Sequence, residues 1–314
     1  MSEEIRTPNA VYSLAVSPGF DKDGVCFAAC RSGLYKSDDR GQSWRYAYDS
    51  LSLQSPLATL AVVTSPDFES DHSVFAGAPG GILRSVDAGE TWSIALLPSP
   101  PPLVSGLVIS PHFDHDGVML AGTMEDGVFR SAYRGVHWAR WNFGLMDLHV
   151  LTMVISPNYA EDETLFVGTE TGVFRSTNGG RAWREVDFPM DYAPVLSLAV
   201  SPDFANDRSL FAGTESSGIF RSTDGGEAWA QVRADVGDEA VNGLLISPEF
   251  STRPEILMML STTLLVSRDG GQKWSEWKTG FSAPQGLSCV AAPLGLDAGA
   301  PLLIGLVEGG VLLI

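Results

Sequence analysis

Apolar and polar residues alternate in blocks along residues 195–232. Four apolar runs, VLSLAV, LFAGT, IFRS and WAQV, are separated by the polar segments SPDFANDRS, ESSG and TDGGEA. Runs of this length between segments rich in glycine, proline, serine and aspartate predict four short β-strands. The separating segments leave no room for a helix, so we expect an all-β unit.

The same block pattern recurs along almost the whole chain. A tryptophan recurs at intervals of 48, 46, 45, 46 and 45 residues, and a serine lies seven residues before each one. A Ser-Pro pair marks the end of the first apolar run in six copies, and Ala292-Pro293 is a weaker seventh. Four-stranded repeats of about 45 residues are typical of propeller blades. The sequence therefore predicts a single seven-bladed β-propeller domain over residues 1–314.

The seventh repeat ends after its third strand, at GGVLLI. The chain begins with EEIRTP, which precedes the first inner strand as QVRAD and EVDFP precede later ones. We therefore expect the N-terminal strand to complete the four-stranded seventh blade and to close the ring, because closure removes the open strand edges.

The segment before each tryptophan is itself a motif. SVDAGETW at 85–92 follows the pattern Ser-x-Asp-x-Gly-x-Thr/Ser-Trp in full, whereas Tyr133 and Asn178 replace the aspartate in copies three and four. On these residues the chain resembles the Asp-box propellers, also called BNR-repeat proteins. Within the wider group of WD40/YVTN/BNR-like repeat proteins, the resemblance extends to sialidases, xyloglucan-cleaving glycoside hydrolases, sortilin-type receptors and photosystem II assembly factors of the Ycf48 type. It implies the propeller fold and leaves the function open.

A short acidic side chain can accept amide hydrogens within a turn, glycine can supply a positive φ, and an indole can cover the hairpin. Six copies around a ring therefore indicate a structural element. The residues to which we assign this role are Asp39, Trp44, Asp87, Trp92, Trp138, Asn178, Trp183, Asp224, Trp229, Asp269 and Trp274. The segments DKDG and DHDG resemble fragments of a calcium loop but lack its other acidic ligands, so we expect no metal and no cofactor.

Loop length points to the candidate binding face. Insertions occur in the turns between strands two and three and in the links between blades, and in an up-and-down blade both lie on one face. Variable loops on a rigid scaffold usually carry the binding residues. The acidic and aromatic residues predicted on this face include Asp147 and His149, and the predicted ligand contacts are Tyr48, Glu125, Asp126, Trp141, Glu170, Tyr192 and Glu215.

These observations leave two functions open. We expect a non-catalytic scaffold that binds a protein or a carbohydrate, and the alternative is a glycoside hydrolase that uses paired carboxylates of the variable face. A sialidase-type site needs an arginine cluster, but the arginines at 84, 130, 175 and 221 share one repeat position and are expected to be structural. No nucleotide or nucleophile motif occurs, and no catalytic residue is assigned.

Composition narrows the partners and the setting. The net charge of −18 and the pI near 4.5 make nucleic acid an unfavourable partner. No apolar run is long enough for membrane insertion, and MSEEIRTPNA lacks the apolar core of a secretory signal. Cys26 and Cys30 are too far apart along one strand to form a disulfide. We therefore expect a cytoplasmic monomer.

Overall fold

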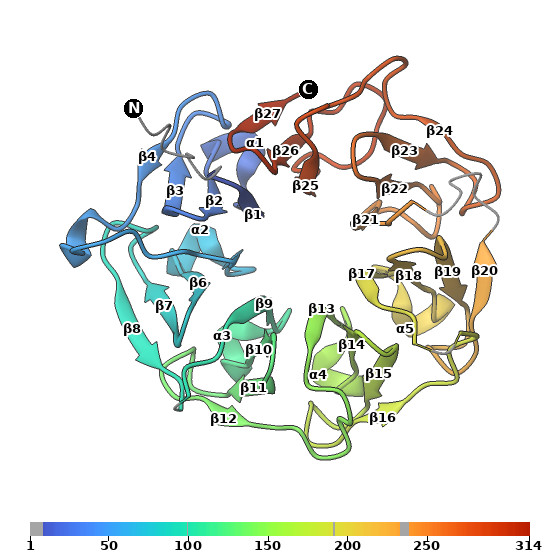
Figure 1. The fold of residues 1–314 in the computed structure, drawn as a ribbon, viewed down its shortest axis with the longest axis horizontal. Helices are drawn as coiled ribbons and strands as arrows, with labels where there is room; N and C mark the ends of the chain where they lie inside the picture. Colours follow the sequence, from blue (N-terminus) through green and yellow to red (C-terminus); the bar gives the residue numbers. More distant parts are fainter. Residues whose placement is uncertain (1–8, 99, 191, 233–238) are drawn as a thin grey trace, which may run out of the picture.

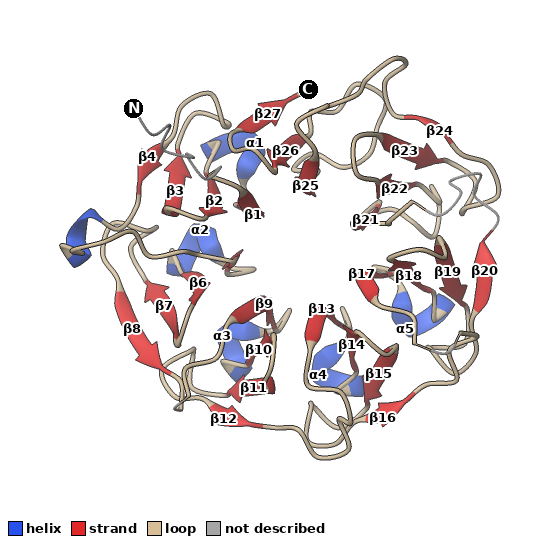
Figure 2. Ribbon diagram, viewed as in Figure 1, coloured by secondary structure: helices blue, strands red, loops and turns tan. Residues whose placement is uncertain are grey.

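The computed structural model describes residues 9–98, 100–190, 192–232 and 239–314. They form seven small antiparallel sheets arranged in a ring, with the first strand of each sheet nearest the axis (Figures 1 and 2). Each inner strand contacts the next around the ring, and β25 of the last sheet contacts β1 of the first. The predicted seven-bladed β-propeller is therefore confirmed.

The strands follow the repeat in chain order. Blades one to three contain β1 (Val11–Val16), β2 (Cys26–Cys30), β3 (Gly33–Ser37), β4 (Arg45–Tyr46), β5 (Ala61–Thr64), β6 (Val74–Ala78), β7 (Gly81–Ser85), β8 (Ser93–Leu96), β9 (Val104–Ile109), β10 (Met119–Thr123), β11 (Gly127–Ser131) and β12 (Ala139–Arg140). Blades four and five contain β13 (Val150–Ile155), β14 (Leu165–Thr169), β15 (Val173–Ser176), β16 (Arg184–Glu185), β17 (Val195–Val200), β18 (Leu210–Thr214), β19 (Ile219–Ser222) and β20 (Ala230–Val232). Blades six and seven contain β21 (Gly243–Ile246), β22 (Ile256–Met259), β23 (Leu264–Ser267), β24 (Ser275–Glu276), β25 (Leu287–Ala291), β26 (Leu303–Leu306) and β27 (Val311–Leu313).

The expectation that no helix fits in a blade was wrong. One-turn helices follow the Ser-Pro pairs of blades one to five: α1 (Phe20–Asp23), α2 (Phe68–Asp71), α3 (Phe113–Asp116), α4 (Tyr159–Asp162) and α5 (Phe204–Asp207), and η1 (Asp49–Leu51) is a 3₁₀ turn in the first link. In blade one, Phe20 is buried, while Asp23 accepts hydrogen bonds from the Ser17 hydroxyl (2.6 Å) and the Val25 amide (2.9 Å). The aspartates that resembled a calcium loop therefore stabilise their own loops by accepting hydrogen bonds within them.

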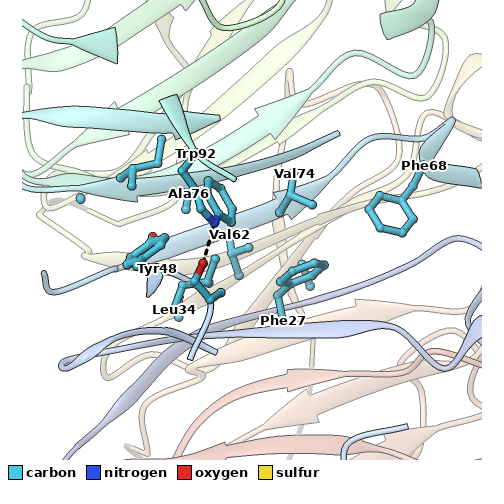
Figure 3. Close-up of a cluster of buried hydrophobic side chains, with 13 residues drawn as sticks. Phe27, Leu34, Tyr48, Val62, Phe68, Val74, Ala76 and Trp92 are labelled. Carbon is cyan, nitrogen blue, oxygen red and sulfur yellow. Dashed lines mark hydrogen bonds between the residues drawn. The ribbon is translucent and has the colours of Figure 1, made fainter. Parts of the chain in front are cut away.

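The core lies between neighbouring blades. One buried cluster joins Phe27 and Leu34 of blade one to Val62, Val74 and Trp92 of blade two (Figure 3). Because each blade buries apolar side chains on both of its faces, its strands read as nearly continuous apolar runs. The five residues of β2 and the five of β14 are all buried.

The start of the described chain meets the last blade. Asn9 forms a parallel bridge with Gly309, and its side-chain oxygen accepts a hydrogen bond from the Ser32 amide (2.9 Å). The last sheet has three strands, β25–β26–β27, within the described part of the chain. The N-terminal strand predicted to complete it precedes Asn9 and lies outside the described residues.

Candidate functional site

The blade topology gives the ring two different faces. We call the face with the Ser-Pro loops and the motif turns, such as 17–25 and 85–92, the box face. We call the opposite face the link face, because it carries the turns between second and third strands, such as 124–126, and the links between blades, such as 186–194. The predicted binding residues belong to segments of the link face.

A cavity opens on the link face at blade four. It has a volume of about 620 Å³ and lies between the link into blade four, the turn after β14, and the link that leaves β16. Its lining residues are Met146, Asp147, Thr171, Gly172, Val173, Phe174, Glu185, Val186, Asp187, Phe188, Met190 and Tyr192. We refer to it as the blade-four pocket.

Asp147 is the buried carboxylate of the blade-four pocket. One of its oxygens accepts hydrogen bonds from the His149 amide (3.0 Å) and ring Nδ1 (3.1 Å), and the other from the Thr171 amide and hydroxyl (3.0 Å each). Burial raises the pKa of Asp147, but hydrogen bonds from His149, Thr169 and Thr171 outweigh it and lower the pKa below its ordinary value. Asp147 therefore supplies a fixed negative charge and is unsuited to act as a general acid.

Part of the apolar lining of this pocket is exposed to solvent. Met146 and Tyr192 are each 83% exposed, and Met190 is also exposed. Phe188 anchors the second link instead, because its ring packs against Phe220 and Trp229 at centroid distances of 4.8 and 5.4 Å. Clustered exposed apolar side chains beside a cavity mark an interaction surface. The pocket therefore offers apolar contact next to an ionised carboxylate.

Three of the predicted ligand residues are exposed glutamates of the link face. Glu125, Glu170 and Glu215 all lie in turns between second and third strands, in blades three, four and five. Glu170 precedes the pocket residue Thr171, and the Glu215 amide donates a hydrogen bond to the Pro194 carbonyl in the link that carries Tyr192. Two of the three therefore flank the blade-four pocket.

The prediction for Tyr48 is corrected by its burial. Tyr48 is 0% exposed, its hydroxyl bonds to Thr59 (3.0 Å), and its ring meets Trp92 edge-to-face at 5.3 Å (Figure 3). The ring lies in the buried cluster between blades one and two, against which Leu51 and Leu57 of the first link also pack. Tyr48 is a packing residue and is removed from the candidate site.

Trp141 and Asp126 are engaged by neighbouring arginines. The Trp141 ring lies 4.4 Å from the guanidinium carbon of Arg130 and 5.7 Å from that of Arg181. Asp126 is half-buried and forms an ion pair with Arg140 at 2.7 Å. Neither residue lines the blade-four pocket, and their contact with a ligand stays a prediction.

Sequence reasoning left Met146, Phe188 and Met190 out of the ligand set. They lie in links, where no strand alternation distinguishes an exposed apolar residue from a buried one. The one sequence feature that could have indicated this pocket is the apolar Met146 directly before the acidic Asp147 in a link.

The motif turns on the box face use their polar atoms internally. In the second blade, Asp87 accepts hydrogen bonds from the Ser85 hydroxyl (2.7 Å) and from the amide and hydroxyl of Thr91. The Gly89 amide donates to Ser85 (2.8 Å), and Trp92 Nε1 donates to Ala47 in blade one (2.8 Å). The carboxylate is saturated by its own turn, which gives it a structural use.

Two further features bear on the chemistry. No group of three or more histidine, cysteine, aspartate or glutamate side chains within the described residues could hold a metal ion. Across the same residues, no helix is long and apolar enough to span a membrane.

Comparison with known proteins supports the fold but does not identify the function. No protein-family model and no curated protein matches the sequence. Among solved structures, the GH74 xyloglucanase from Xanthomonas campestris matches 99% of the chain with a TM-score of 0.74 and 17% identity. YCF48 bound to D1 peptide matches 98% with a TM-score of 0.71 and 16% identity, and the chain covers 93% of it.

The extracellular domain of a one component system from B. thetaiotaomicron matches 98% of the chain, with a TM-score of 0.71 and 15% identity. The chain spans 38% of that protein and 52% of the xyloglucanase. The chain is thus a β-propeller similar in fold to glycoside hydrolases and to proteins of other kinds. At these identities the likeness extends to the fold alone.

Proposed function

We propose that this propeller is a non-catalytic binding module that holds a protein or carbohydrate ligand at its link face, centred on the blade-four pocket. The observation that carries the proposal is the pairing of exposed apolar side chains, Met146 and Tyr192, with the ordered carboxylate of Asp147 in one cavity. Concave sites in which a few fixed polar groups orient a ligand beside apolar side chains are typical of ligand binding.

The lining favours a protein ligand with neighbouring apolar and basic side chains. Glu185 and Asp187 add acidic groups to Asp147, and Glu170 and Glu215 stand at the flanks. The whole chain carries a net charge of −18, which attracts cationic partners and repels anionic ones. An apolar side chain of the ligand would contact Met146 and Tyr192 while a lysine or arginine beside it meets the carboxylates.

The experiment is a titration of the protein with a short peptide that contains tryptophan and lysine, followed by backbone amide chemical shifts. We expect shifts at residues 146–147, 171–174 and 186–190, and binding that weakens as salt is added. Tyr192→Ala combined with Met146→Ser should abolish the shifts and leave the fold intact. Leu96→Ser is the matched control, because Leu96 is 81% exposed and lies outside the pocket.

Binding that is equally strong in the Tyr192→Ala, Met146→Ser variant would rule out this pocket. Shifts confined to the box face would show that the ligand uses the opposite face.

A glycoside hydrolase is the second candidate. Its support is the exposure of Glu170 and Glu215 in adjacent blades and the fold similarity to GH74 xyloglucanases. A hydrolysis screen with xyloglucan and other glycans tests it, using Glu170→Gln and Glu215→Gln. Product release by the parent protein that both variants lose would establish catalysis and overturn the non-catalytic proposal.

The cytoplasmic location and the monomeric state stay predictions. The three cysteines are free thiols, and burial raises the pKa of Cys26 and Cys30 to about 12, so both thiols remain protonated and unreactive. One protein of similar fold is an extracellular domain. Fractionation of the native host and light scattering of the purified protein test the two predictions.

A further inference from the structure

One repeat position places a basic side chain at the boundary between neighbouring blades. The residue just before each motif serine is Lys36, Arg84, Arg130, Arg175 and Arg221 in blades one to five. Lys36, Arg175 and Arg221 contact the motif turn of the following blade. The repeat thus allows five equivalent boundaries to be compared.

At two boundaries a glutamate of the following blade pairs with the basic side chain. Glu90 lies 3.1 Å from the Lys36 ammonium and also pairs with Arg45. Glu227 pairs in the same way with Arg175 and Arg184. Both glutamates occupy the same position in the motif, two residues before the tryptophan.

At two other boundaries the arginine has a different partner. The Arg130 guanidinium stacks on Trp141 at 4.4 Å. Arg221 donates to the Gly270 carbonyl (3.4 Å) and to the Ser209 hydroxyl (3.2 Å) and lies over the Phe211 ring. In both cases groups of this chain contact the guanidinium, although its Nε is buried without a hydrogen-bond partner.

Arg84 differs from the other four. Val136 stands where Glu90 and Glu227 stand in their motifs, and Tyr133 replaces the motif aspartate. Within the described part of the chain, the Arg84 side chain makes no hydrogen bond, ion pair or aromatic stacking contact, whereas the terminal nitrogens of Arg175 and Arg221 have partners. The buried Nε without a hydrogen-bond partner is common to Arg84, Arg130, Arg175 and Arg221 and does not distinguish Arg84. An open cavity of about 450 Å³ lies beside it.

The walls of this cavity are rich in hydrogen-bond donors, although the chain as a whole is acidic. The donors are the guanidinium groups of Arg84 and Arg134, the Tyr133 hydroxyl, and the rings of His115 and His137. One acidic residue, Asp116, also lines it.

The oxygens of Asp116 are already in use within its own loop. They accept hydrogen bonds from the Ser110 hydroxyl (2.6 Å) and the Val118 amide (2.8 Å). The nearby Asp114 carboxylate lies 3.1 Å from His115 Nε2. A guanidinium with free donors is best satisfied by a carboxylate, which it can bind through two parallel hydrogen bonds.

From this comparison we propose that the cavity at Arg84, between blades two and three on the box face, binds a carboxylate supplied by another molecule. The incoming carboxylate takes the place that Glu90 and Glu227 fill at their own boundaries. Arg84 is its main partner, and the Tyr133 hydroxyl and the imidazoles provide further donors. This site is separate from the blade-four pocket and does not depend on the function proposed for it.

The test follows the Nε–H signals of arginine in nitrogen–proton spectra during titration with acetate and with a glutamate-containing peptide that is amidated at its C-terminus, so that the glutamate carries its carboxylate. The same peptide with glutamine in place of glutamate, and inorganic phosphate, serve as comparisons. We expect a saturable shift of the Arg84 signal with both carboxylates and none with the glutamine peptide. Arg221, whose terminal guanidinium nitrogens already donate to Gly270 and Ser209, is the matched control, and its signal should not shift.

A designed internal carboxylate gives an independent readout. Val136 is 49% exposed, so Val136→Glu should fold, pair with Arg84 as Glu90 pairs with Lys36, and compete with the added carboxylate. We expect affinity for acetate and for the peptide to fall about tenfold or more, as for loss of a charge-assisted hydrogen bond. Val136→Gln introduces a side chain of the same size as glutamate but without the charge, so this variant should still bind acetate and the peptide.

Each outcome decides the proposal. Peptide binding much tighter than acetate binding supports an acidic protein segment as the natural source of the carboxylate, and equal affinities support a free small carboxylate. An Arg84 signal that does not move, a shift that survives Val136→Glu, or binding of phosphate without carboxylate overturns it.

Discussion

The Asp147 carboxylate accepts hydrogen bonds from both the amide and the hydroxyl of Thr171, each at 3.0 Å. Asp147 belongs to the link that enters blade four, whereas Thr171 lies in the turn between β14 and β15 of that blade. One buried acid therefore ties the link to the turn and shapes the wall of the blade-four pocket.

Asp147→Ala should lower the free energy of unfolding by about 1.5–3 kcal/mol, because Thr171 and His149 lose a charged acceptor. Urea denaturation measures this change. Glu170→Ala, one residue before Thr171 and exposed, is the control and should change stability by less than about 0.5 kcal/mol. Equal stability of the two variants would show that the hydrogen bonds of Asp147 contribute little.

Trp183→Ala should lower the free energy of unfolding by about 3–5 kcal/mol. Trp183 is 4% exposed, and its indole nitrogen donates to the Trp141 carbonyl of the preceding blade at 2.9 Å. Thermal and urea unfolding measure the loss, with Tyr192→Ala as an exposed aromatic control. Peptide binding should survive in folded Trp183→Ala. Lost binding at unchanged stability would instead make the motif tryptophan a ligand residue.

Asp87 gives the protein a pH-dependent stability. Burial raises its pKa, but hydrogen bonds from Thr91, Ser85 and the Glu90 amide outweigh burial and lower the pKa to about 2. The unfolded value is about 3.9, so the stabilisation is full above about pH 4 and is lost as the pH falls toward 2. The difference in unfolding free energy between the parent protein and Asp87→Asn should therefore shrink over that range.

Asn178 provides the matched control for that titration. It occupies the aspartate position in blade four, where its side-chain oxygen accepts from the Ser176 hydroxyl (3.0 Å) and the Ala182 amide (2.9 Å). An amide does not titrate, so the cost of Asn178→Ala should be the same at pH 2 and at pH 5. A constant difference for Asp87→Asn across this range would contradict the assigned shift.

Replacing Glu125, Glu170 and Glu215 together with glutamine should leave the melting temperature unchanged, because all three side chains are exposed. Binding of a basic peptide should weaken, and its dependence on salt should decrease, since three negative charges are removed. Calorimetric titration at two salt concentrations measures both effects. Unchanged affinity and unchanged salt dependence would exclude this acidic arc from the site.

Deleting residues 1–10 should destabilise the ring at blade seven. The deletion removes the Asn9 bridge to Gly309 and the hydrogen bond from the Arg31 amide to the Ala10 carbonyl (3.0 Å), together with the predicted clasp strand. The exposed edge of β27 should also promote self-association, which light scattering detects. Equal melting temperature and solubility would contradict closure by the N-terminal segment.

The repeat by itself determined the architecture. Six tryptophans at a spacing of 45–48 residues, each at the start of the fourth of four apolar runs, required blades of nearly constant length, and stacking such blades gives the ring. The sequence also allowed the link face to be predicted as the face with variable loops, because insertions in these loops do not disturb a four-stranded sheet. The exposure of Glu125, Glu170 and Glu215 could be predicted for the same reason.

Tertiary structure decided everything that depends on how a link packs. Tyr48 and Tyr192 are both tyrosines of links, yet one is fully buried against Trp92 and the other is 83% exposed. Links have no hydrophobic period, so their sequence does not show which side chain turns inward. Arg84 and Arg175 share one repeat position, but their contacts depend on the next blade around the ring. Arg175 forms an ion pair with Glu227, whereas Arg84 lines a cavity together with Val136. Contacts between blades join residues about 50 positions apart, which local patterns do not reveal.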